Sequence, residues 1–201
     1  MTLFDLTNKT AIVTGSTKGI GRATANRLAE HGANVVISSR KASACNQVAE
    51  DINRNWATGG AKAIPISCNI NHKDQLRALV DRTLDTFGTI DILVCNAAVN
   101  PYFGPSADIS DEAFNKTMES NVRSTFWICN MVIPEMDNIH GGSITIISSI
   151  GGLRGRPLIG AYGISKAADM QIARNLATEY GPNNIRANCI APGLIRTDFA
   201  R

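Results

Sequence analysis

The alternation of short apolar runs with longer amphipathic segments constrains the fold of this chain more than any other feature. Strands that are buried on both faces and separated by helices pair in parallel through right-handed crossovers. In the segments between the runs, apolar residues such as Leu76, Leu79 and Val80 recur at helical spacing. The pattern therefore predicts an α/β fold with one doubly wound parallel sheet, built as a single domain over residues 1–201. Six runs rich in Ile and Val have the length of strands: Thr10–Thr14, Asn34–Ser38, Ala63–Ser67, Ile90–Cys95, Ser143–Ser148 and Ile185–Ile190.

Length and charge limit the kinds of partner that we expect. The 201 residues are 44% hydrophobic, which is enough for one globular domain with a packed core. The 20 Lys and Arg exceed the 17 Asp and Glu by three charges without forming a basic run, so the electrostatic footprint of a nucleic-acid-binding protein is missing. No apolar stretch approaches the roughly 18 residues that span a bilayer, and Met1–Asp5 has no basic region. We therefore expect a cytoplasmic protein with neither a nucleic-acid nor a membrane partner.

The cysteines do not form a pattern that is typical of a disulfide framework or a metal site. They are odd in number, widely separated and without a C-x-x-C pair. We therefore expect no metal, and thiols that are reduced and buried as small hydrophobic groups. The five are Cys45, Cys68, Cys95, Cys129 and Cys189.

Residues that could bind a ligand or take part in catalysis lie directly after the predicted strands. Gly15, Ser39, Asn96, Ser149 and Pro192 each follow the carboxyl end of a different run, or come within two residues of it. Parallel strands bring these ends to one edge of the sheet, and ligands of doubly wound sheets bind there. The sequence therefore predicts a single site at this edge.

A glycine-rich turn after the first strand predicts a binding site for the phosphates of a dinucleotide. The segment Gly15-Ser16-Thr17-Lys18-Gly19-Ile20-Gly21 leads into a helix that extends to about His31. Glycine lets the backbone turn tightly and approach phosphates, while the N-terminus of the helix offers free N–H groups. Because residue 17 is Thr, the spacing is G-x-x-x-G-x-G and not G-x-G-x-x-G, and no Walker A sequence follows. A purely structural turn remains the alternative.

The end of the second strand indicates which dinucleotide is preferred. An acidic residue at this place binds the ribose hydroxyls of NAD, but here Ser39 and Arg40 follow the strand. Ser39 does not repel a 2′-phosphate, whereas Arg40 can pair with one, and Lys18 adds a second cation. We therefore expect NADP(H), with NAD(H) possible. The alternative is that these basic side chains are merely solvated.

Tyr162 and Lys166 lie four residues apart, so a helix that begins near Ala161 places both on one face. A free phenol has a pKa of about 10, too high for a base near neutrality. A cation about 4 Å away is worth about 4 kcal/mol at an effective dielectric of 20, enough to bring a phenol near working pH. The pair therefore predicts that Tyr162 is a general acid/base. Tyr and Lys at this spacing also occur on ordinary amphipathic helices, where they only pack and solvate.

Taken together, these motifs resemble the short-chain dehydrogenase/reductase family. The resemblance extends in order from about Lys9 to Arg201, and Asn96-Ala97-Ala98-Val99-Asn100-Pro101 is similar to its carbonyl-reductase branch. It implies a Rossmann fold and an NADP(H)-dependent oxidoreductase that interconverts a small ketone or aldehyde and the alcohol. It is carried by Thr14-Gly15-x-x-x-Gly19-x-Gly21, Asn96-Ala97, Asn121, Ser149, Tyr162-x-x-x-Lys166 and Pro192-Gly193 with Thr197.

The resemblance also implies a role for each matching residue. Tyr162 exchanges a proton with the substrate oxygen, and Ser149 orients that oxygen, with Ser148 as the weaker candidate. Lys166 holds the nicotinamide ribose, and Asn121 positions a water in a proton relay to Lys166. Further cofactor contacts are expected from Ser16, Ile20, Asn69, Ile70, Asn96, Ala97, Pro192, Gly193, Ile195 and Thr197.

The chain departs from the family pattern at its C-terminal end. Family members continue beyond the position of Arg201 through a substrate lid and a seventh strand, so we expect the Ile185–Ile190 strand to form an apolar edge. A nucleotide-binding scaffold without turnover is therefore the second interpretation. A serine hydrolase ranks lower because neither Ser148 nor Ser149 lies in a G-x-S-x-G turn. The helical segments Asp111–Met136 and Ala161–Tyr180 match those that form dimer interfaces in the family, which implies a homodimer or homotetramer.

Overall fold

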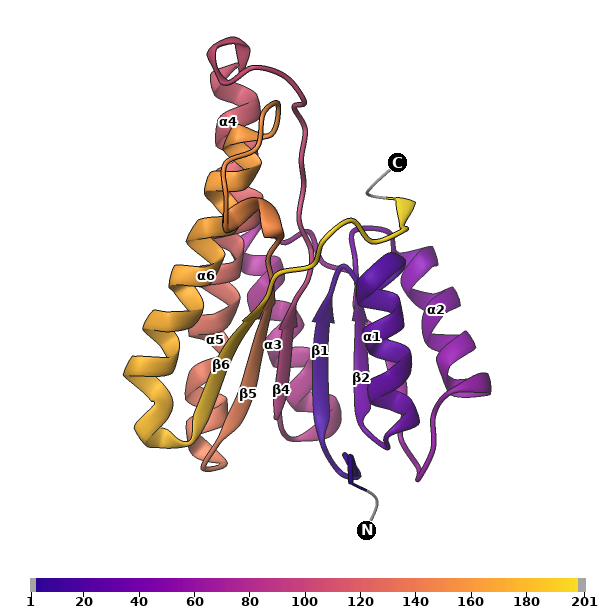
Figure 1. The fold of residues 1–201 in the computed structure, drawn as a ribbon. Coiled ribbons are helices and arrows are strands. Elements are labelled where there is room, and N and C mark those ends of the chain that lie inside the picture. The colour runs from indigo at the N-terminus through magenta and orange to yellow at the C-terminus, as the bar shows by residue number, and fades with distance from the viewer. Residues whose placement is uncertain (1–2, 199–201) are drawn as a thin grey trace.

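The computed structural model describes residues 3–198, which contain a sheet of six parallel strands in the order β3-β2-β1-β4-β5-β6 (Figure 1). The doubly wound α/β prediction is confirmed: the chain winds outward from β1 in one direction and then, beginning with β4, in the other. The junction between β1 and β4 is therefore the point at which ligands bind in such sheets. The strands are β1 (Thr10–Thr14), β2 (Asn34–Ser38), β3 (Ala63–Pro65), β4 (Ile92–Cys95), β5 (Gly142–Ile147) and β6 (Ile185–Ile190).

Helices cover the sheet on both sides, and each side has its own hydrophobic core. Along β1, Ile12 belongs to the core shared with α3, α5 and α6, whereas the next residue, Val13, belongs to the core shared with α1 and α2. A strand that faces a core on both sides has no polar face, which explains its continuous apolar sequence. The helices are α1 (Gly19–Glu30), α2 (Ala42–Asn55), α3 (Lys73–Phe87), α4 (Asp111–Met118), α5 (Ser124–Asn138) and α6 (Gly160–Tyr180), with short 3-10 turns at Ser106–Asp108, Ile150–Gly152 and Gly181–Asn183.

The segment expected to form one helix over Asp111–Met136 is interrupted. Between α4 and α5, the backbone widens into a π turn over Glu119–Arg123, which contains Asn121. The hydroxyl of Thr125 donates to the Asn121 carbonyl at 2.8 Å, four residues back, so a side chain takes part in the bonding of the widened turn. Insertions of this kind frequently occur at functional sites. The helical segment is confirmed, but the π turn within it was not predicted, because apolar periodicity does not report such an insertion.

β6 lies at one edge of the sheet, as the sequence predicted. Its residues alternate between buried and more accessible positions, and Ile190 at its end is half exposed. Arg201, at which the family resemblance ends, lies outside the described residues. Among the residues that the structure describes, no helix combines the length and apolar character that a membrane span needs.

Candidate functional site

A cleft of about 290 Å³ opens at the carboxyl edge of the sheet, between the segments that follow β1, β2, β4, β5 and β6. Most of the residues predicted from the sequence line this one cleft. Ser16, Gly21 and Asn121 are not among its lining residues. The predicted lining residues are Gly15, Lys18, Gly19, Ile20, Ser39, Arg40, Asn69, Ile70, Asn96, Ala97, Ser149, Tyr162, Lys166, Pro192, Gly193, Ile195 and Thr197, and Ser148 lines it as well.

The glycine turn fits tightly against the segment after β4. Gly15 has a φ of +65°, and a Cβ there would lie 2.9 Å from the Cα of Ala97. A Cβ on Gly21 would lie 2.4 Å from Nδ2 of Asn96. That same Asn96 nitrogen donates to the carbonyls of Thr14 at 2.9 Å and Gly15 at 3.1 Å. Asn96 therefore shapes the turn from behind, and any larger residue at Gly21 would displace it.

Ser16 supports the turn from below. It is fully buried, its N–H donates to the Ser38 carbonyl at 3.1 Å, and its Oγ accepts from the Ser38 N–H at 2.9 Å. These two bonds join the ends of β1 and β2. The position of Ser16 thus matches a structural role beneath the site.

The N-terminus of α1 points into the cleft with its N–H groups uncapped. Lys18 occupies the N-cap position, its side chain caps no backbone N–H, and the first turn contains no acidic residue. Unpaired N–H groups and the positive end of the helix dipole attract anions such as phosphates. Together with the space that the glycines leave free, this arrangement fits the pyrophosphate of a dinucleotide.

The segments that follow β2 and β3 form one end of the cleft, which we call its far end. Exposed Lys18 and Arg40 border it, and Ser39 and Asn69 complete its polar lining. The amide oxygen of Asn69 accepts from the Asn71 N–H at 3.3 Å, which fixes its orientation. His72 is the N-cap residue of α3, and Asn71, directly before it, lines the cleft.

Cys68 is a lining residue that the sequence reasoning missed. It is 2% exposed, and burial, with a smaller contribution from Asp74, raises the pKa of its thiol to about 11. Its N–H donates to the Ser39 carbonyl at 3.0 Å, so it holds the two loops of this end together. The sequence indicated only that Cys68 is a buried thiol, and no motif connected it with the site.

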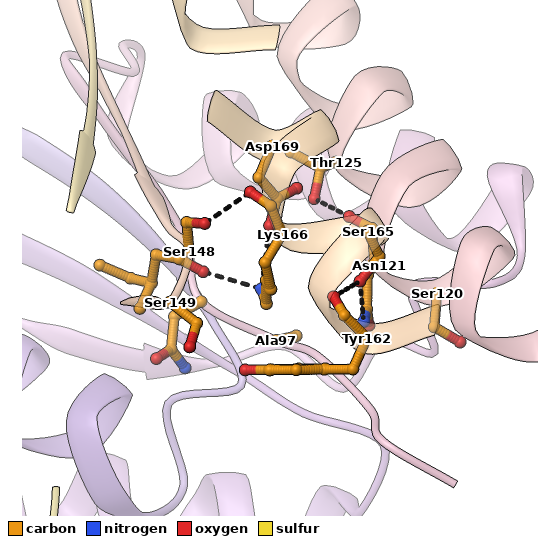
Figure 2. A network of polar contacts seen from close by, with 12 residues as sticks. Ala97, Ser120, Asn121, Thr125, Ser148, Ser149, Tyr162, Ser165, Lys166 and Asp169 are labelled. Atoms are coloured by element: carbon orange, nitrogen blue, oxygen red, sulfur yellow. Dashed lines mark hydrogen bonds and ion pairs between the residues drawn. The ribbon is translucent and has the colours of Figure 1, made fainter. Parts of the chain in front are cut away.

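The catalytic candidates meet at the end of β5 (Figure 2). Tyr162 and Lys166 are on α6, as their spacing predicted, and the Lys166 nitrogen lies 5.8 Å from the centre of the Tyr162 ring. Figure 2 shows the Tyr162 side chain extending toward the side on which Ser149 lies. The Ser149 Oγ accepts from the Gly151 N–H at 3.1 Å, and because this bond uses a lone pair, the hydroxyl proton is still available as a donor.

Lys166 is buried, and its ammonium group is held by two acceptors. Its Nζ donates to the Ile147 carbonyl and to Oδ2 of Asp169, each at 2.9 Å. Asp169 is 1% exposed and was missed by the sequence reasoning, although its i,i+3 spacing from Lys166 is a recognisable signal. Burial raises the pKa of the Asp169 carboxyl, and the neighbouring Lys166 opposes that effect.

Asn121 lies beneath the site and joins three segments. Its Oδ1 accepts from the Val99 N–H at 2.8 Å, and its Nδ2 donates to the Val99 carbonyl and to the Ser165 hydroxyl, each at 2.9 Å. Ser165 in turn donates to the Tyr162 carbonyl at 2.8 Å. Both amide hydrogens of Asn121 are therefore engaged in positioning the loop after β4 and the first turns of α6.

The segment after β6 crosses the strand ends and closes one side of the cleft (Figure 1). The Pro192 carbonyl accepts from the Ile150 N–H at 3.0 Å, which ties this segment to the turn after β5. Farther along, Thr197 packs on the glycine turn, because a Cβ on Gly19 would lie 3.3 Å from its methyl carbon. The four predicted residues of this segment thus line the cleft along its length.

The thiols are reduced in this structure. Cys95 and Cys129 lie with their Sγ atoms 3.9 Å apart in the core, and all five cysteines are free. Within residues 3–198, no group of three or more His, Cys, Asp or Glu side chains is arranged to hold a metal ion.

Known proteins place this geometry in a family. The family model described as short chain dehydrogenase matches residues 9–201. A protein from Sus scrofa, Dehydrogenase/reductase SDR family member 4, is 42% identical over 199 residues, which are 98% of this chain and 69% of that protein.

Solved structures agree. A 7α-hydroxysteroid dehydrogenase, in complex with NADH and 7-oxo glycochenodeoxycholic acid, superposes with a TM-score of 0.91 at 37% identity, covering 97% of this chain and 74% of that one. Levodione reductase superposes with a TM-score of 0.92 at 29% identity, covering 97% and 75%. The chain therefore belongs to the short-chain dehydrogenase/reductase family of oxidoreductases, which interconvert alcohols and carbonyl compounds with a nicotinamide cofactor.

Proposed function

We propose that this chain is an NADP(H)-dependent carbonyl reductase, or the corresponding alcohol dehydrogenase, with Tyr162 as its general acid/base. The observation that carries the proposal is that Tyr162, Lys166 and Ser149 line the same cleft as the glycine turn. A phenol, an ammonium group and a hydroxyl are thereby placed beside the site that fits a dinucleotide. The carbonyl-reductase branch is further supported by the Ala97-to-Pro101 segment, whose Ala98 and Val99 also line the cleft.

Three side chains divide the work of proton transfer. Tyr162 donates its phenolic proton to the carbonyl oxygen during reduction, and it accepts the hydroxyl proton during oxidation. Ser149 donates a hydrogen bond to the same oxygen and so fixes its position. The positive charge of the Lys166 ammonium group favours the ionised form of the Tyr162 phenol. The same group would donate hydrogen bonds to the hydroxyls of the nicotinamide ribose. When bound, the nicotinamide supplies or receives the hydride at the carbonyl carbon.

Asn121 takes part through the atoms that it positions. It keeps the Val99 loop and Ser165 in register with α6, and Ser165 bonds the backbone of Tyr162. We propose a proton relay toward Lys166 that includes a water bound to Asn121. The amide hydrogens of Asn121 do not bind this water, because both are already donated to protein acceptors. A relay water would therefore donate to an oxygen of Asn121, either Oδ1 or the main-chain carbonyl, each of which already accepts one hydrogen bond.

The preference for NADP(H) rests on charge at the far end of the cleft. Lys18 and Arg40 supply two cations, and Ser39 stands where a carboxylate would repel a 2′-phosphate. Both cations are exposed, so they can reach a phosphate without a buried charge being left behind when the site is empty. NAD(H) would bind without using either charge.

We also propose that the chain assembles as a homodimer or homotetramer through its long helices. Phe126 on α5 is 52% exposed and Ile164 on α6 is 56% exposed, so both helices present a large apolar side chain at the surface. Burial of both against a second copy accounts for their position. Sedimentation velocity at micromolar concentration tests this, and a monomer contradicts it.

The oxidoreductase proposal is tested by following the absorbance of NADPH with a panel of small ketones and aldehydes. We expect turnover that falls by at least about a hundredfold in Tyr162→Phe, since general acid/base catalysis contributes that much. Tyr180→Phe, at the other end of α6, is the matched control and retains activity. Persistent absence of turnover, with tight NADPH binding retained, would contradict the proposal.

A further inference from the structure

The helix that carries Tyr162 and Lys166 also carries the carboxylate of Asp169, and the ion pair between the two charged groups is buried. The side chain of Lys166 is 4% exposed and that of Asp169 is 1% exposed, with 2.9 Å between Nζ and Oδ2. Lysine has three N–H donors, and Asp169 and the Ile147 carbonyl take two of them. Two of the three N–H groups of the ammonium are thus held by the protein itself, at the wall of the cleft that Lys166 lines.

The surroundings of Asp169 provide little other compensation for its charge. Its second oxygen, Oδ1, is buried without a hydrogen-bond partner. The titratable groups that interact with the pair from the packed elements are thiols: Cys95 on β4 with its neighbour Cys129 on α5, and Cys189 on β6. The hydrogen bond with Cys129, together with burial, raises the pKa of the Cys95 thiol, and burial raises the pKa of the Cys189 thiol, so both are protonated near neutrality and add no charge.

A carboxylate so placed acts on Tyr162 as well as on Lys166. The 2.9 Å from Oδ2 to Nζ and the 5.8 Å from Nζ to the Tyr162 ring centre put Oδ2 no more than about 9 Å from that ring centre. At this distance and an effective dielectric near 20, one negative charge opposes phenol ionisation by about one pH unit. The Asp169 charge therefore offsets a substantial part of what the Lys166 charge contributes.

We propose that Asp169 is a positioning residue that holds the ammonium group of Lys166 at the wall of the cleft and offsets part of its charge, so that it sets the pH range in which Tyr162 exchanges its proton. This rests on the proposed function of Tyr162 as general acid/base. Asp169 lies outside the Tyr-x-x-x-Lys motif, yet under this proposal it controls how strongly Lys166 favours ionisation of Tyr162. Asp169 acts without contact to the reacting atoms: it holds Lys166 by the ion pair, and its charge acts on Tyr162 from a distance.

The decisive measurement is the pH profile of alcohol oxidation in Asp169→Asn, which keeps the shape of the side chain and removes its charge. We expect the pH of half-maximal kcat to fall by about one unit, because the ionised phenol loses a repelling neighbour. Asp169→Ser, which leaves room for a water beside Nζ, should shift the profile in the same direction and replaces the asparagine variant if that does not fold. Asp169→Glu restores the charge and should return the profile toward that of the parent.

Asp91→Asn is the matched control. Asp91 is also buried, pairs with Lys9 at 2.8 Å and accepts from the Thr10 N–H at 2.9 Å, but it lies before β4, at the opposite edge of the sheet. Its loss should lower stability without moving the pH profile. A profile in Asp169→Asn that moves by less than about 0.3 unit, or upward, would overturn the proposal, since the charge effect estimated above is about one unit.

A second readout separates failure of this proposal from failure of the proposed function. The near-ultraviolet absorbance of tyrosinate, taken as the difference between each protein and its Tyr162→Phe derivative, follows Tyr162 without any turnover. If no alcohol or carbonyl compound reacts but Asp169→Asn still moves this titration, the oxidoreductase proposal fails and the role of Asp169 stands. If turnover occurs and neither the titration nor the kinetic profile moves, the role of Asp169 fails.

Discussion

Replacement of Asn121 by alanine tests how the site is held together. Asn121 is 1% exposed, and its side chain makes three hydrogen bonds: one from the Val99 N–H, one to the Val99 carbonyl and one to the Ser165 hydroxyl. Each contributes about 1 kcal/mol, so Asn121→Ala should lower the free energy of unfolding by about 3 kcal/mol. For a domain of this size, that corresponds to a fall in Tm of roughly 6–12 °C.

Urea unfolding and hydrogen exchange measure two separate consequences. Urea unfolding gives the loss of stability, and the amide exchange of the peptide that contains Val99 reports whether the loop after β4 is released. Asn121→Asp separates the bonds, because its carboxylate still accepts from the Val99 N–H but donates to neither of the other two partners. We expect this variant to lose stability while the Val99 amide remains protected.

Asn130→Ala is the matched control on α5. The Asn130 side chain donates to the Phe126 carbonyl at 2.8 Å, but the bond is exposed, so its loss should cost less than about 0.5 kcal/mol. The reasoning is refuted if Asn121→Ala costs no more than Asn130→Ala. It is also refuted if the Val99 amide exchanges at the same rate in Asn121→Ala as in the parent.

Two further predictions concern residues that line the far end of the cleft. Arg40→Ala removes a charge-assisted bond worth about 1.5–3 kcal/mol, so the KM for NADPH should rise about 10- to 100-fold and the KM for NADH should hardly change; equal changes in steady-state kinetics would remove Arg40 from the phosphate site. Cys68, with its pKa raised to about 11, should be protonated and resist alkylation near neutrality. Its labelling by iodoacetamide, followed by mass spectrometry, should rise about tenfold per pH unit below that pKa, because the thiolate is the nucleophile; labelling near neutrality as fast as in the unfolded chain would contradict this.

The sequence predicted those features that depend on neighbours along the chain. β1, β2 and β6 have the predicted bounds. Burial on two faces leaves a continuous apolar run in β1 and most of β2, whereas the edge strand β6 alternates between buried and accessible residues. The Ala63–Ser67 run forms a strand only over its first three residues, and the Ile90–Cys95 run only over its last four. Apolar character extends beyond the residues that find a pairing partner, so strand ends were less accurate than strand positions.

Contacts between segments that are far apart along the chain could not be predicted from the sequence. The sequence placed Asn121 at the site by resemblance, but its bonds to Val99 and Ser165 depend on how the loop after β4 packs on α6. Likewise, the role of Ser16 beneath the turn depends on β2 lying beside β1. Such partners are 22 or more residues apart, and local propensity carries no information about them.

By itself, the sequence determined the α/β class, the glycine turn and the single edge to which the reactive side chains belong, because periodicity and turn chemistry act over a few residues. Only the tertiary structure decided the strand order, the π turn around Asn121 and the burial of the Lys166–Asp169 pair. The spacing of Lys166 and Asp169 is visible in the sequence. The Coulomb interaction between two such charges is weak when the pair is exposed to water and strong when the pair is buried. Burial comes from the packing of α6 against β5 and β6, so the electrostatics of the site are a property of the assembled fold.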